Sequence, residues 1–101
     1  MIPDRIVLTL PPDPAFARLT RLATLHFLRH HGVRTVEARR RTALVERRTR
    51  AALRAARRAP ASSGALALTL LTRGRALEVR LRRSRGAADR LFVVPRPEGA
   101  A

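Results

Sequence analysis

The order of predicted elements constrains this chain more than any other feature. A strict alternation predicts a strand over Arg5–Leu10, and the breaker at Pro11 and Pro12 ends it. Two long helical patterns follow, and the apolar segment over 65–82 then alternates as a β-hairpin does. We therefore expect an α+β fold, with two helices packed on one face of a small, mostly antiparallel sheet. The expected order is strand, helix, helix, strand, strand, with a candidate last strand over 91–94.

The first helical pattern begins at Asp13 and Pro14, an N-cap acceptor followed by a proline, and ends at Gly32. Its expected apolar stripe is Phe16, Leu19, Ala23 and Phe27, with Leu22 at the edge. Leu25 and Leu28 fall instead on the side of the arginines. Those arginines are Arg18, Arg21 and Arg29. Leu25 and Leu28 are therefore either covered by the second helix, which is the preferred interpretation, or exposed for a partner.

The second helical pattern begins at Thr35 as N-cap and stops at Pro60. Its expected buried face consists mostly of small residues, which allow a close approach to the sheet. They are Ala38, Thr42, Val45, Thr49, Ala52, Leu53 and Ala56. The opposite face is basic: Arg39, Arg40, Arg47, Arg50, Arg54, Arg57 and Arg58. This basic face is either a solvated surface or a surface that binds in a groove of a nucleic acid. The second interpretation is weakened because the chain has few aromatic residues to stack on bases.

The hairpin is centred on Arg73 and Gly74. Its inward side chains are expected to be leucines and a valine: Leu66, Leu68, Leu70, Leu77, Val79 and Leu81. Glu78, Arg80 and Arg82 alternate with them on the return strand and are expected to face water. Residues 1–94 are predicted to form a single domain, and the segment 95–101 to form a flexible tail.

Composition limits the kinds of chemistry that this chain can perform. Its 101 residues suffice for one domain, and its 22 basic residues are all arginine, against 7 acids. The net charge of +15 favours an anionic partner. The codon bias of a GC-rich genome would also place arginine at surface positions where many residue types are acceptable. The absence of lysine excludes a P-loop and Schiff-base catalysis, and the absence of cysteine excludes disulfides, thiolate catalysis and cysteine zinc sites. The N-terminal apolar run is too short for a signal peptide or a membrane span, so we expect a cytoplasmic protein without a membrane partner.

No metal site or catalytic residue is expected. His26 and His30 are four residues apart, but Phe27 stands where a metalloprotease helix carries its glutamate, and no third ligand is evident. Ser62, Ser63 and Ser84 lie outside any nucleophile elbow.

The segment TALVERRTRAAL, which contains Glu46, resembles the helix of the anti-sigma regulatory factors, which are small members of the histidine-kinase-like ATPase superfamily. The resemblance starts at the first strand and its Pro-x-Asp-Pro breaker and extends to about Gly86. It implies a truncated form of that ATPase fold. In the family, a Glu-x-x-x-Asn helix supplies a general base and a ligand for the magnesium of ATP, and Glu46 matches that glutamate.

Two departures from the family pattern indicate that the nucleotide site is degenerate. Arg50 replaces the magnesium-binding asparagine, and a guanidinium has no acceptor with which to hold a cation. The Asp-x-Gly-x-Gly motif that reads adenine is missing, and Gly86 is the one glycine in the corresponding stretch, 82–88. The degenerate nucleotide-site candidates are thus Glu46, Arg50 and Gly86, with no cofactor expected and ATP with magnesium only if the site still works. Glu46 with Arg50, and Glu37 with Arg41, also have the spacing of simple helical ion pairs.

The family resemblance implies an ATP-dependent serine/threonine kinase, but the missing magnesium and adenine motifs favour a regulatory protein-binding domain without enzyme activity. By the same resemblance its partner is a sigma factor or an anti-sigma antagonist, and it can also form a homodimer. The candidate partner contacts are Arg18, Arg21, Leu25, Leu28 and Arg29. One alternative is a basic nucleic-acid-associated protein, and a second is an active ATP-dependent serine/threonine kinase of the same family.

Overall fold

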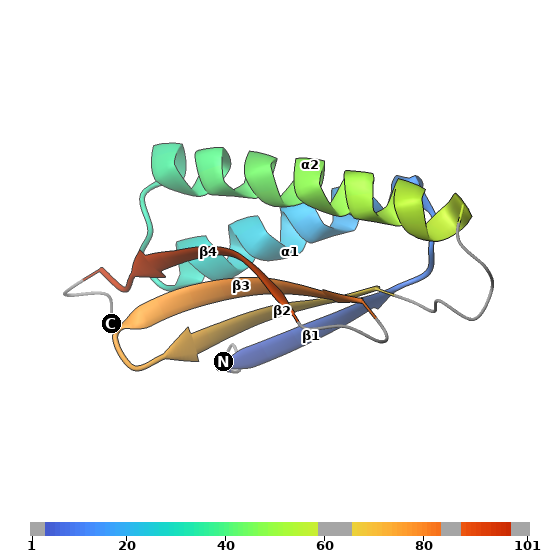
Figure 1. Cartoon of the computed structure of the whole chain (residues 1–101). Helices are drawn as coiled ribbons and strands as arrows, with labels where there is room; N and C mark the ends of the chain where they lie inside the picture. Colours follow the sequence, from blue (N-terminus) through green and yellow to red (C-terminus); the bar gives the residue numbers. More distant parts are fainter. Residues whose placement is uncertain (1–3, 59–65, 84–87, 98–101) are drawn as a thin grey trace.

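The computed structural model describes residues 4–58, 66–83 and 88–97, which form a sheet covered by two helices (Figure 1). Their order confirms the α+β fold. The strands are β1 (Arg5–Leu10), β2 (Leu66–Arg73), β3 (Ala76–Arg83) and β4 (Asp89–Pro95). The helices are a short 3₁₀ turn (Pro14–Phe16), α1 (Ala17–His30) and α2 (Thr35–Arg58). No helix in the described ranges is both long and apolar enough to cross a membrane.

The sheet is antiparallel throughout, in the order β1-β2-β3-β4. The helical pair connects β1 to its neighbour β2, and the last three strands follow one another directly. Leu8 pairs with Leu68, which pairs in turn with Leu81, so inward leucines lie in one row across three strands. A register shift between Val79 and Arg80 marks a bulge where β4 pairs with β3. The candidate strand at 91–94 is thus confirmed within a longer β4.

Two glycines have the positive φ that their turns require. Gly74 has a φ of 59° in the β2–β3 turn, where Arg73 still pairs with Ala76. Gly32, two residues after the end of α1, has a φ of 88°, and its amide donates to the carbonyl of Arg29. The predicted hairpin turn and the predicted end of the first helix are therefore both confirmed.

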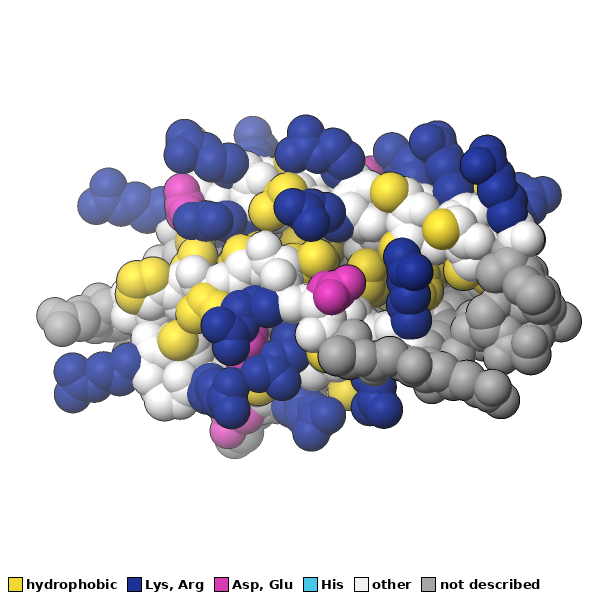
Figure 2. Space-filling model, viewed as in Figure 1, with side chains coloured by type: hydrophobic (Ala, Val, Ile, Leu, Met, Phe, Trp, Pro, Cys, Tyr) yellow, Lys and Arg dark blue, Asp and Glu magenta, His cyan; other side chains and the backbone are white. Residues whose placement is uncertain are grey.

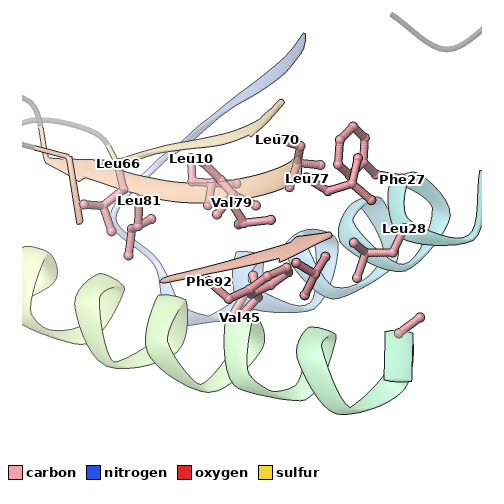
Figure 3. Close-up of a cluster of buried hydrophobic side chains, with 14 of the residues drawn as sticks. Leu10, Phe27, Leu28, Val45, Leu66, Leu70, Leu77, Val79, Leu81 and Phe92 are labelled. Atoms are coloured by element: carbon pink, nitrogen blue, oxygen red, sulfur yellow. The ribbon is translucent and has the colours of Figure 1, made fainter. Parts of the chain in front are cut away.

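The core lies between the sheet and the helices (Figure 3). All six inward residues predicted for the hairpin are buried, and Leu10 joins them from β1. Phe92 and Val94 add the contribution of β4. Figure 3 shows Val45 of α2 and Phe27 of α1 directed toward these strand side chains. Removal of this apolar surface from water supplies the main stabilisation of the fold.

The buried face of α2 agrees with the prediction, except that Ala56 is only half-buried. The fully or almost fully buried residues are Ala38, Thr42, Val45, Thr49, Ala52 and Leu53. α2 contacts β4, while α1 lies beside α2 and contacts β2. The N-cap of α2 is Arg34, whose carbonyl accepts a hydrogen bond from the amide of Ala38. The observed cap is therefore one residue earlier than the predicted cap at Thr35.

The predicted apolar stripe of the first helix is wrong at two positions. Leu19 and Leu22 are exposed, whereas Thr20 and Thr24 are fully buried together with Phe27. The remaining buried positions of the helix are Ala17 and Leu28, followed by His31 just after it. α1 packs against both the sheet and α2, so short threonine side chains take the places of close approach. The hydroxyl of Thr20 is satisfied within the helix, since it donates to the carbonyl of Ala17 at 2.5 Å.

β4 ends beyond the predicted domain boundary at residue 94. Pro95 pairs with Ala76, and the amide of Arg96 donates to the carbonyl of Arg75 at 2.6 Å. The last described residues therefore lie against the β2–β3 turn, and 98–101 lie outside the described residues.

Candidate functional site

Glu46 projects from α2 toward α1, and arginines approach both of its carboxylate oxygens. Oε1 accepts a hydrogen bond of 3.2 Å from Arg50, one helical turn away. Oε2 lies 3.8 Å from the guanidinium of Arg21 on α1. The side chain is 16% exposed, so it is a half-buried carboxylate held between two cations. A guanidinium only donates hydrogen bonds, so this arrangement offers no coordinating partner for a divalent cation.

The hollow beside Glu46 is a basic surface depression of about 430 Å³. Its lining comes from α2 alone: Ala43, Glu46, Arg47, Arg50, Ala51 and Arg54. Arg50 therefore stands both in the ion pair and in the wall of this hollow. Gly86, the third degenerate nucleotide-site candidate, lies outside the described residues. The structure thus brings Glu46 and Arg50 together and leaves Gly86 undescribed.

Two further clefts lie at the β4 side of α2. One, of about 210 Å³, has Arg48, Arg83, Asp89 and Leu91 in its lining. The other, of about 490 Å³, lies at the turn between the helices and is lined in part by Glu37 and Arg41. Arg41 donates to Glu37 at 2.9 Å, as the helical spacing predicted, and its guanidinium also lies 5.6 Å from the ring centre of Phe92. This contact ties α2 to β4.

The three histidines do not form a ligand set. His26 and His30 are exposed, whereas His31 is buried, with its ring centre 4.8 Å from that of Phe27 in an edge-to-face arrangement. Burial lowers the pKa of His31, and the positive charges of Arg96 and His30 lower it further. The part of the chain that the structure describes contains no cluster of three or more candidate metal ligands.

The predicted partner contacts on α1 divide into buried and exposed positions. Leu28 is fully buried and Leu25 is half-buried, which agrees with the intramolecular cover preferred for them. Arg18, Arg21 and Arg29 are exposed. Leu19 and Leu22, which the sequence pattern assigned to the core, lie beside these arginines with exposed fractions of 51% and 58%. The exposed surface of α1 is therefore both apolar and basic.

A buried carboxylate on the other side of the sheet was missed by sequence reasoning. Glu78 on β3 faces away from the helices, yet its side chain is only 2% exposed. Oε1 accepts from Arg90 at 2.6 Å and lies 3.0 Å from the Nε of Arg80, while Arg73 approaches Oε2 at 3.7 Å. Burial alone would raise the pKa of Glu78, but the hydrogen bonds from Arg80 and Arg90 hold this pKa below its ordinary value.

The available signal for this cluster was a lone glutamate among alternating arginines on β3. It was insufficient because Arg90 comes from β4, and the bulge at Val79 and Arg80 sets the register that brings Arg90 beside Glu78.

Comparisons of this chain with protein-family models, with curated proteins and with solved structures find no match.

Proposed function

We propose that this chain is a regulatory protein-binding domain whose partner contacts the outward surface of α1. The observation that carries the proposal is the exposure of Leu19 and Leu22, one helical turn apart. The exposed residues Arg18 and Arg29 lie on the same helix, and one guanidinium nitrogen of Arg29 donates to the carbonyl of Val33 at 2.9 Å. We name Leu19, Leu22, Arg18 and Arg29 the α1 surface. Neighbouring exposed leucines on a helix leave apolar area in water, and a partner protein would remove it.

The chemistry of the α1 surface defines the partner that fits it. Burial of one leucine side chain contributes about 1.5–3 kcal/mol, so Leu19 and Leu22 can supply the centre of an interface. Arg18 and Arg29 would then meet carboxylates at the rim, where charges favour association and specificity. The complementary partner has an apolar patch bordered by acidic residues. By resemblance to the anti-sigma factors, we propose a sigma factor or an anti-sigma antagonist in this role.

A homodimer through the α1 surface is less favourable than a complex with an acidic partner. Two copies would bring Arg18 and Arg29 of each chain close to those of the other, and like charges repel. A partner of opposite charge has no such penalty.

The surroundings of Glu46 support a binding role without phosphotransfer. Arg21 and Arg50 occupy the space around its carboxylate where a magnesium-dependent enzyme needs oxygen ligands. We therefore propose that the domain acts by binding alone.

The test is affinity capture from a nuclease-treated lysate of the source organism, with the wild-type chain and a Leu19→Ser/Leu22→Ser variant. Both positions are more than half exposed, so we expect the variant to remain folded, which circular dichroism checks. Val36→Ser is the matched control, because Val36 is an apolar side chain that is 74% exposed and belongs to α2 rather than to the α1 surface.

We expect wild type and Val36→Ser to retain the same sigma factor or antagonist, and the double variant to lose it. Equal capture by all three chains, or recovery of nucleic acid alone, would contradict the proposal.

A further inference from the structure

We infer that the helix-free face of the sheet binds duplex DNA through its phosphates. This face lies opposite the two helices (Figure 1) and is separate from the α1 surface. It is formed by the outward side chains of the four strands, which we name the open sheet face. Arginine side chains project from the sheet as well as from the helical layer (Figure 2).

The open sheet face carries a two-dimensional set of arginines. They are Arg5 on β1, Arg73 on β2, Arg80 and Arg82 on β3, and Arg90 on β4. Neighbouring strands lie about 4.8 Å apart and alternate residues of one strand about 6.6 Å apart, so these positions span an area of about 20 by 14 Å. A 20 Å length of duplex carries about twelve phosphates, which exceeds the number of arginines available to contact them.

Glu78 fixes the central guanidinium groups of this face. It lies beneath Arg80 and Arg90, which approach the same carboxylate oxygen at 3.0 and 2.6 Å. A free arginine loses rotamer freedom when it binds, whereas these two side chains are already held in place before any ligand arrives. Five guanidiniums against one carboxylate leave the open sheet face with a formal charge of +4 among the described residues.

The charge of this carboxylate is offset by Arg80 and Arg90, and its side chain is only 2% exposed, so an approaching phosphate does not contact it. In the helical layer the carboxylates are more accessible. Glu37 is 38% exposed there and Glu46 16%, and each is surrounded by arginines that are partly engaged with it. Among the residues that the structure describes, the open sheet face shows no other carboxylate, because Asp89 lines the cleft on the helix side of β4.

The remaining side chains of the open sheet face favour a duplex over a single strand. Between the arginines lie the short side chains of Thr9, Ala67 and Thr69 and the aliphatic side chains of Val7, Leu71 and Val93, none of which is aromatic. Single strands are bound largely by stacking of bases on aromatic rings, and Phe92, the phenylalanine of the sheet, points into the core. Recognition through phosphates alone is strongest where charge density is highest, which is on the duplex.

The test is fluorescence anisotropy with a generic labelled DNA duplex of 20 base pairs over a series of salt concentrations. The sheet variant is Arg5→Gln/Arg82→Gln, since both residues are exposed and neither forms an ion pair with a described residue. The matched control is Arg47→Gln/Arg54→Gln on the outward face of α2, which removes the same two charges from exposed residues.

We expect the sheet variant to bind the duplex at least tenfold more weakly than wild type at 0.1 M salt. The slope of log K against log salt should decrease in magnitude by about 1.8, or 0.9 for each lost phosphate contact. The control should retain affinity within about threefold and keep the wild-type slope, and a single strand of equal length should bind more weakly than the duplex.

An equal loss in both variants would show that net charge alone drives binding and would overturn the inference. A larger loss of affinity in the control variant would contradict the inference and indicate a binding site on α2. Absence of duplex binding by the wild-type chain would also contradict it. The Leu19→Ser/Leu22→Ser variant should bind the duplex as wild type does, so failure of the protein-binding proposal remains distinguishable from failure of this one.

Discussion

The Nε of Arg90 donates a hydrogen bond of 2.6 Å to Oε1 of Glu78, which joins β4 to β3 on the face of the sheet away from the helices. Arg80 approaches the same oxygen from within β3 at 3.0 Å. A carboxylate buried this completely is stable only with such partners. The pair therefore explains why a glutamate is tolerated between Leu77 and Val79, and it fixes the edge strand to the sheet.

Glu78→Gln should lower the free energy of unfolding by about 1–2 kcal/mol. Hydrogen bonds to charged groups contribute about 1.5–3 kcal/mol, and partial exposure of Arg80 and Arg90 lets water replace some of the loss. Urea unfolding at pH 7 measures the change. Glu46→Gln is the control, with an expected loss below about 1 kcal/mol because the Glu46 side chain is itself more exposed and its contacts, at 3.2 and 3.8 Å, are longer. Equal losses in the two variants would contradict the special role of Glu78.

His31 should make the protein less stable as the pH falls through the ordinary histidine range. Its pKa is lowered in the folded state by burial and by the charges of Arg96 and His30, so the unfolded chain binds the proton more readily. Stability is therefore full above the unfolded pKa of about 6.5 and decreases as the pH drops toward the folded value.

Thermal unfolding at pH 7.5 and 5.5 tests this dependence on His31. Wild type should lose more stability than a His31→Phe variant over this interval, because only the wild-type unfolded chain gains the proton of His31 more readily than the folded one. Replacement of exposed His26 by Gln should leave the pH dependence as it is in wild type. An unchanged pH dependence in His31→Phe would be evidence against the explanation.

Thr49→Val should stabilise the fold by about 1 kcal/mol. The hydroxyl of Thr49 is buried without a hydrogen-bond partner, and a methyl group of similar size has no such cost. Thr42→Val is the matched control on the same helix, because its hydroxyl donates to the carbonyl of Arg39 at 3.0 Å. Denaturant unfolding should show a gain for Thr49→Val and none for Thr42→Val, and a gain of the same size in both would refute the reasoning.

The strands and the second helix could be predicted from the sequence because each buries one regular face. Leucines alternate strictly on β2 and β3, so the period alone assigns the inward side chains such as Leu68 and Leu81. On α2, small residues and Leu53 recur at helical spacing opposite a continuous row of arginines. Gly74 marks the turn because a positive φ is needed there.

The first helix was harder to predict because hydrophobicity alone assigns Leu22 rather than Thr24 to the core. Thr24 is buried where the helix lies close to its neighbours, and Leu22 faces outward. Part of the α1 surface was therefore assigned to the core. The prediction that Glu78 faces water was wrong for a related reason. Its burial depends on Arg90, which comes from a strand whose register is set by a bulge. Both errors concern contacts between elements, which local periodicity does not contain.

The central claim is that this chain is a binding domain in which Arg21 and Arg50 occupy the surroundings of Glu46 where a nucleotide enzyme would place magnesium. Isothermal titration of the full chain with ATP and magnesium tests it most directly. The account predicts no saturable heat at micromolar nucleotide, in wild type and in an Arg50→Asn variant that restores the family residue without restoring the adenine-reading motif. Saturable, magnesium-dependent binding of ATP by the wild-type chain would contradict it.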